Sequence, residues 1–137
     1  MIFRNDDVSH ETNLQQFAAV HLNFYRYDVL HTVALICKDI QKAPALIKFI
    51  NESKIDVQVH AWEHTDFTQL TRDEMRVQFK KSITCIKKHF KKTPTVFYPP
   101  WNKSNIFVEE VAAEFGLTVS SNKISLSQYL RGATGEV

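Results

Sequence analysis

Two short polar strings, each directly behind a strand-like segment, carry the side chains of this sequence that could do chemistry. Asp6 and Asp7 follow the apolar start of the chain, and His60 and His64 follow the alternating run 55–59. If both strings lie at one edge of a sheet, two imidazoles and a carboxylate converge in a set that suits a divalent metal, above all Zn²⁺. The second carboxylate would then be placed to take a proton from a water molecule that the metal activates. The pattern therefore predicts a hydrolytic metal centre.

The rest of the sequence alternates short β-type runs with amphipathic helical stretches. This rhythm predicts an α/β fold with a mainly parallel sheet, in the form of an incomplete or distorted (β/α) barrel of about five βα units. We expect strands over residues 1–3, 32–36, 56–59, 95–97 and 117–119, and helices over residues 14–24, 44–50, 72–90 and 107–115. The active sites of such folds gather beyond the carboxyl ends of the strands, which is where the two polar strings fall.

Capping signals set the expected ends of the helices. Thr12 with Gln15 resembles a capping box before the first helix, and Thr71 can cap the third. Pro44 suits the first turn of the second helix. Gly116 fits the position just after the last helix, where a left-handed backbone is common.

Composition limits the broad class of protein. At 137 residues the chain is expected to form one domain, and its 17 Lys and Arg against 15 Asp and Glu give no reason to expect a nucleic acid partner. No apolar stretch approaches the roughly 20 residues that span a bilayer, and no secretion signal is visible, so we expect no membrane partner and a cytoplasmic location. Cys37 and Cys85 have no motif spacing, which indicates buried thiols.

Three motifs, in order along the chain, resemble those of polysaccharide deacetylases of the NodB-homology type, carbohydrate esterase family 4. Residues 3–8, Phe-Arg-Asn-Asp-Asp-Val, are similar to the family's T-F-D-D-G in their two acids, with Val8 in place of glycine. Residues 60–64, His-Ala-Trp-Glu-His, keep both histidines of H-[ST]-x-x-H, and residues 98–101, Tyr-Pro-Pro-Trp, keep both prolines of R-P-P-Y. The resemblance implies metal-dependent hydrolysis of acetamide groups on an N-acetylated sugar or polysaccharide.

The resemblance also implies a role for each motif residue. Asp7, His60 and His64 would hold one divalent metal, Zn²⁺ before others, and Asp6 would be the general base. The backbone N–H of Trp101 would help to hold the oxyanion. The surface in contact with the sugar would comprise Trp62, Tyr98, Pro99, Pro100 and Trp101. The three aromatic side chains among them could equally be core residues.

Two departures from the family bear on catalysis. Tyr98 stands where the family has an arginine that orients the base, so the motifs do not identify a group that orients Asp6. Family members also carry a general-acid histidine on a late strand, and this sequence has no histidine after His89. We therefore expect residues 1–137 to form a single short or truncated deacetylase domain that lacks its C-terminal strands. The alternative function is a metal-containing carbohydrate-binding relative with little or no catalysis. A second copy of the chain could cover the sheet edge left exposed.

A third interpretation takes the string from His60 to His64 as the H-x-x-E-H signature of inverted zinc peptidases. That motif needs a helix to bring both histidines to one face, together with Glu63 and a later glutamate such as Glu110 or Glu114. The alternating run before His60 favours a strand followed by a loop instead, so a peptidase is the least favoured of the three functions.

Overall fold

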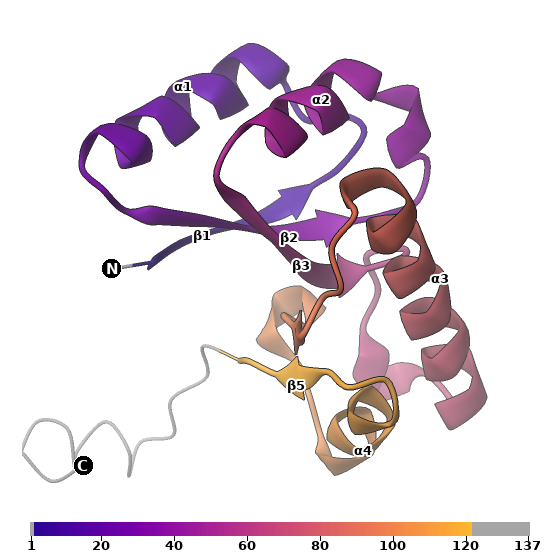
Figure 1. The fold of residues 1–137 in the computed structure, drawn as a ribbon. Helices are drawn as coiled ribbons and strands as arrows, with labels where there is room; N and C mark the ends of the chain where they lie inside the picture. The colour runs from indigo at the N-terminus through magenta and orange to yellow at the C-terminus, as the bar shows by residue number, and fades with distance from the viewer. Residues whose placement is uncertain (1, 122–137) are drawn as a thin grey trace, which may run out of the picture.

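A parallel five-stranded sheet organises the computed structural model, which describes residues 2–121 (Figure 1). The strands are β1 (Ile2–Val8), β2 (Leu30–Ile36), β3 (Ile55–Ala61), β4 (Val96–Phe97) and β5 (Thr118–Val119). The helices are α1 (Leu14–Arg26), α2 (Pro44–Glu52), α3 (Arg72–Phe90) and α4 (Ile106–Glu114), with short 3₁₀ turns at Ile40–Lys42, Phe67–Gln69 and Pro100–Asn102. The strands pair in sequence order, and every pairing is parallel.

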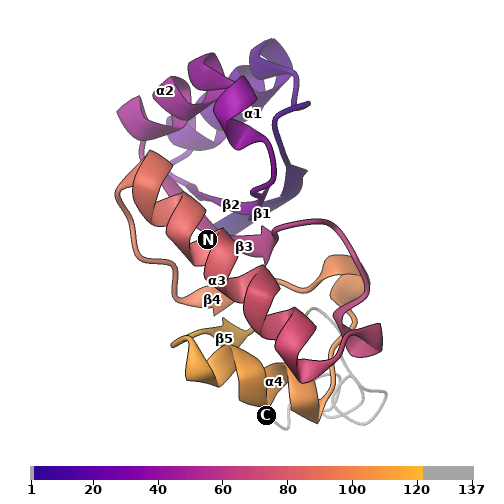
Figure 2. The same cartoon turned by 90° about the vertical axis from the view of Figure 1, so that its right-hand side faces the viewer.

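Each helix connects two neighbouring strands and packs close to the sheet. α1 and α2 lie side by side near β1 and β2, α3 runs along β3, and α4 lies against β5 (Figures 1 and 2). Because the strands are parallel, their carboxyl ends share one edge of the sheet. The α/β class and the parallel sheet are therefore confirmed. Within residues 2–121 the sheet is open, with β1 and β5 at its two edges.

All five strands and four helices lie where the sequence predicts them, but three of the strands are longer than expected. β1 shows the largest difference, because it continues through Asp6 and Asp7 to Val8 although only residues 1–3 were predicted. A strand is held by backbone hydrogen bonds, so polar side chains near its end do not prevent pairing. The two aspartates therefore belong to the strand itself and not to a loop behind it.

The predicted start of the first helix is wrong in detail. α1 is capped by Asn13, whose side chain accepts a hydrogen bond from the Gln16 N–H at 2.9 Å. The Thr12 hydroxyl instead accepts from the Ser9 N–H at 2.9 Å. Asparagine is as good an N-cap as threonine or better, so the residue nearer the helix takes the role.

The other helix ends agree with their signals. Thr71 forms the capping box of α3, because its hydroxyl accepts from the Glu74 N–H at 3.1 Å and the Glu74 carboxylate accepts from the Thr71 N–H at 3.3 Å. Pro44 is the first residue of α2. Gly116 follows α4 with φ of +73°, a left-handed conformation that glycine adopts without strain.

Apolar side chains between the sheet and the helices hold the strand ends in place. Phe67, Phe79 and Phe97 are fully buried, and their ring centroids lie 4.8 to 5.3 Å apart. Cys37 and Cys85 are both buried and free, as predicted. None of the helices within residues 2–121 is long and apolar enough to cross a membrane.

Candidate metal centre

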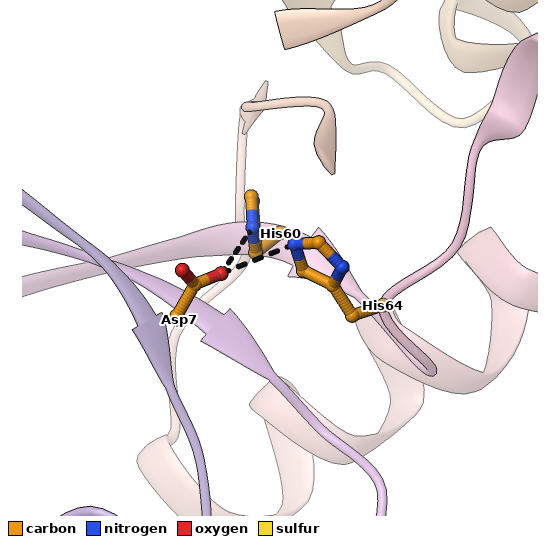
Figure 3. Close-up of side chains that lie close together, drawn as sticks. All are labelled: Asp7, His60 and His64. Atoms are coloured by element: carbon orange, nitrogen blue, oxygen red, sulfur yellow. Dashed lines mark hydrogen bonds and ion pairs between the residues drawn. The ribbon is translucent and has the colours of Figure 1, made fainter. Parts of the chain in front are cut away.

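Asp7 occupies a strained backbone position at the end of β1. The pairing with β2 changes register between Asn5 and Val8, which marks a β-bulge, and Asp7 has φ of +61° inside it. A left-handed conformation costs a non-glycine residue about 1 to 2 kcal/mol. Bulges re-aim side chains at the ends of strands. Here the Asp7 carboxylate points across the sheet edge toward β3 (Figure 3).

His60 is buried in β3 and is fixed by the segment that follows β4. Its Nδ1 lies 2.6 Å from the carbonyl oxygen of Tyr98. Because a carbonyl oxygen can only accept, Nδ1 carries the hydrogen, and Nε2 of the neutral ring keeps its lone pair for a metal. That Nε2 lies 2.9 Å from Asp7 Oδ1.

His64 completes the cluster of ligand atoms. Its Nε2 lies 3.2 Å from the same Asp7 oxygen (Figure 3), and the ligand atoms of Asp7, His60 and His64 all lie within 4.8 Å of one another. Bonds of about 2.0 to 2.1 Å to a tetrahedral Zn²⁺ would separate its ligand atoms by about 3.3 Å. Imidazole lone pairs and a carboxylate oxygen at this spacing repel one another unless a proton or a cation lies between them. The donor set therefore fits a divalent metal.

The surroundings of His64 favour its neutral form. Burial, with a smaller effect from His60, lowers the pKa of His64 below its ordinary value. The Trp101 ring stands edge-on to the His64 imidazole, with 4.3 Å between the ring centroids. A metal ligand must be a neutral imidazole, so a lowered pKa prepares His64 for this role near pH 7.

The segment after β4 borders the centre on the side of His64. Pro99 and Pro100 are buried and lead into a tight turn in which Trp101 has φ of +55°. The Trp101 residue is 60% exposed, so part of its ring is open to a ligand beside His64. The structure thus brings this segment to the cluster, and its contacts with a substrate stay predictions.

Asp6 lies beside the candidate ligand Asp7 but has a different partner. Nε of Arg4 lies 2.8 Å from Asp6 Oδ1, and Nη2 of Arg4 donates a hydrogen bond to Asp6 Oδ2 at 3.1 Å. The guanidinium carbon of Arg4 also lies 4.6 Å from the centroid of the Tyr98 ring. Arg4 was not predicted to take part in the site. The signal for it was its place two residues before Asp6, because residues i and i+2 of a strand share a face.

Trp62 does not join this group of side chains. Its ring lies near Lys81 of α3, with the ammonium nitrogen 5.6 Å from the ring centroid, and its backbone N–H donates to the Gln78 side chain. The pairing of β2 with β3 contains an extra β3 residue at His60, which breaks the alternation of side chains just before Trp62. Contact of Trp62 with a substrate stays a prediction.

The peptidase interpretation lacks the helix that it requires. His60 belongs to β3, and His64 lies in the loop that follows it. Glu63, which would be the peptidase's base, forms an ion pair with Lys38 at 2.8 Å. The arrangement therefore does not support the peptidase function.

Comparison with known proteins agrees with the motifs and the geometry. Residues 6–120 match the sequence model of the family described as polysaccharide deacetylase. This chain belongs to the polysaccharide deacetylase family. The match begins at Asp6 and extends past β5, so it includes the predicted ligands and all but the start of the described sheet.

Individual relatives of this deacetylase-family chain are distant. Chitin deacetylase 1 of Cryptococcus neoformans var. grubii is 26% identical over 87 residues, which are 64% of this chain and 18% of that protein. A carbohydrate esterase family 4 pseudoenzyme from Bacillus anthracis has a TM-score of 0.76 at 19% identity, over 87% of this chain and 42% of that one. The family 4 carbohydrate esterase from Streptomyces lividans, in complex with acetate, has a TM-score of 0.71 at 20% identity, over 86% of this chain and 58% of that one. The chain thus shares the fold of the two solved structures and spans less than two thirds of the length of each of the three proteins.

Proposed function

We propose that this chain binds one divalent metal ion, with Zn²⁺ preferred, and hydrolyses acetamide groups on an N-acetylated sugar or polysaccharide. The observation that carries the proposal is the meeting of Asp7, His60 and His64 at one sheet edge, with Asp6 next to them in β1. Membership of the family over residues 6–120 supports the class of reaction.

Each residue of the cluster has a separate task in this proposal. A divalent ion held here would polarise the acetamide carbonyl and lower the pKa of a water molecule. His60 offers Nε2, because the Tyr98 carbonyl keeps its hydrogen on Nδ1. Asp7 offers a carboxylate oxygen whose negative charge suits a cation, and His64 offers the second imidazole. Asp6 accepts the proton of the attacking water molecule through a carboxylate that is not needed as a ligand.

The segment after β4 is proposed to bind the substrate. The exposed part of the Trp101 ring offers an apolar surface for a sugar ring beside the metal centre. Because Pro99 and Pro100 have no N–H, Trp101 supplies the first amide hydrogen after Tyr98, and we propose that it holds the oxyanion. Trp62 is a second proposed sugar contact, outside the cluster.

Acetate release from a short N-acetylglucosamine oligomer tests this function. The purified chain, loaded with one equivalent of Zn²⁺, should release acetate, and His64→Ala should lose both the bound zinc and the reaction. His89→Ala is the matched control, because His89 lies in the last turn of α3 and not in the cluster. If the zinc-loaded chain releases no acetate from N-acetylated oligosaccharides, hydrolysis is contradicted.

A carbohydrate-binding protein with little catalysis is the second candidate function. The observation that favours it is that, within residues 2–121, the cluster holds no histidine besides His60 and His64, so no third imidazole of the described residues belongs to it as a proton donor for the departing amine. Loss of a general acid would slow departure of the amine by about 10²- to 10⁴-fold. Zinc-dependent binding of the oligomer without acetate release would select this candidate over the deacetylase.

A further inference from the structure

Arg4 lies where it can control the carboxylate of Asp6. The two side chains come from the same face of β1, and both nitrogens that Arg4 presents lie within 3.1 Å of an Asp6 oxygen. The Arg4 side chain is only 15% exposed, so the contact is partly shielded from water. The hydrogen bond to Asp6 Oδ2 and the close charged contact with Asp6 Oδ1 together restrain the plane of the carboxylate as well as its position.

Tyr98 holds the arginine from the other side. The Arg4 guanidinium carbon lies 4.6 Å from the centre of the Tyr98 ring, within the range of a cation–π contact. The carbonyl oxygen of the same Tyr98 accepts from His60 Nδ1. One residue therefore supports both the arginine beside Asp6 and the metal-ligand histidine, which links the two halves of the site.

Asp6 needs such support because of its place in the chain. It lies within the β-bulge of β1, directly before Asp7 with its left-handed backbone, where the pairing with β2 is interrupted. Its Oδ1 is buried and accepts no well-directed hydrogen bond from the residues that the structure describes. Without the arginine, the carboxylate would be free to rotate about its side-chain bonds, and only one orientation can serve the centre.

We infer that Arg4 is a positioning residue of the reaction: it holds the Asp6 carboxylate in a single orientation beside the metal centre, from a platform formed by the Tyr98 ring. The inference rests on the proposed function, because it assumes that Asp6 is the base. Its alternative is a purely structural ion pair within β1. If Arg4 is a positioning residue, its removal should change the orientation of the Asp6 carboxylate and lower turnover. If the ion pair is only structural, its removal should lower stability and leave the carboxylate orientation and turnover unchanged.

The test compares Arg4→Ala and Arg4→Lys with the zinc-loaded parent chain. Arg4→Ala should keep its zinc and bind the N-acetylglucosamine oligomer with a similar KM, while kcat falls by about 10²-fold, the loss that follows from misplacing a catalytic group. Arg4→Lys keeps the charge without the two-pronged contact and should recover only a small part of the rate. Guanidinium ion at millimolar concentration should raise kcat of Arg4→Ala and leave Asp6→Asn unchanged. Arg26→Ala, an exposed arginine at the end of α1, should behave like the parent.

A structural measurement decides the inference even if the chain proves inactive. In crystal structures of the zinc-loaded proteins, Asp6 should have one carboxylate orientation in the parent and several in Arg4→Ala. Absence of acetate release from the parent would contradict the proposed function and leave this comparison intact. An unchanged kcat in Arg4→Ala, or an Asp6 carboxylate that keeps its single orientation without the arginine, would overturn the role of Arg4.

Discussion

His60 donates the hydrogen on its Nδ1 to the carbonyl oxygen of Tyr98, across a distance of 2.6 Å. Tyr98 precedes Pro99, and a residue before proline is restricted to extended conformations, so the direction of this carbonyl is fixed locally. The bond sets which imidazole nitrogen is free to meet Asp7. The segment that we propose to bind the substrate thus also orients a proposed metal ligand.

Changing each of the two adjacent aspartates to asparagine should have a different effect, because Asp7 is the proposed ligand and Asp6 the proposed base. Asp7→Asn removes the charge of a proposed ligand, so the affinity for Zn²⁺ should fall by about 10-fold or more. Asp6→Asn keeps the size of the side chain but cannot accept a proton, so zinc should stay bound while hydrolysis falls by about 10²-fold or more. Competition with a chromogenic chelator measures the first effect, and acetate release measures the second. Equal loss of zinc in both variants would refute the division of roles.

The strained backbone at Asp7 should lower the stability of the metal-free chain. In Asp7→Gly the left-handed conformation is no longer strained, so the metal-free variant should be at least as stable as the metal-free parent, and by up to about 1 kcal/mol more stable. Zinc should raise the melting temperature of the parent and not that of the variant. The matched control is Asp28→Gly, because Asp28 has φ of +56° in the turn before β2 and is no part of the cluster. A large loss of stability in Asp7→Gly alone would show that the position is not strained.

A buried pair of histidines should make the fold sensitive to acid. Nδ1 of His31 lies 3.2 Å from Nδ1 of His21, and His31 is 1% exposed. Burial, with a smaller effect from His21, lowers the pKa of His31 from 6.5 to about 4. Between these pH values the unfolded chain binds a proton that the native chain does not. The contribution of His31 to stability is therefore complete above pH 6.5 and is lost as the pH falls toward 4.

The size of this effect follows from the shift in pKa. A difference of this size corresponds to about 3 kcal/mol in the free energy of unfolding. Urea unfolding of the metal-free chain at pH 7 and at pH 4 measures this loss in the free energy of unfolding. Between the two pH values, His31→Phe should lose about 3 kcal/mol less than the parent. His10→Gln, outside the pair, should follow the parent. Parallel pH profiles for the parent and His31→Phe would disprove the effect.

The meeting of Asp7, His60 and His64 could be predicted because these residues lie at or just beyond the ends of parallel strands. Asp7 follows the first apolar run and His60 the third, and the carboxyl ends of parallel strands share one edge. The order of these residues along the chain was therefore enough to place them together. The helix ends were predictable from local capping residues, except at the start of α1, where Asn13 and not Thr12 is the N-cap.

The remaining parts of the site depend on features without a local signal. The extra residues in β1 and β3 shift the alternation of side chains, and this decides that Trp62 lies near α3 while Asp7 faces His60 and His64. The pairing of Arg4 with Tyr98 joins residues that are distant in sequence. The contact between His21 and His31 likewise depends on how α1 packs on β2. Such contacts follow from the tertiary fold, which periodicity alone does not specify.

The most direct test of the metal centre is a crystal structure of the zinc-loaded chain with anomalous scattering recorded at the zinc edge. We expect one strong peak per chain, at about 2.0 to 2.2 Å from Asp7 Oδ1, His60 Nε2 and His64 Nε2, with Asp6 outside bonding distance. A crystal of His64→Ala grown in the same way should lack the peak. Zinc bound elsewhere on the chain, or a parent crystal without a peak at these three atoms, would contradict the central claim.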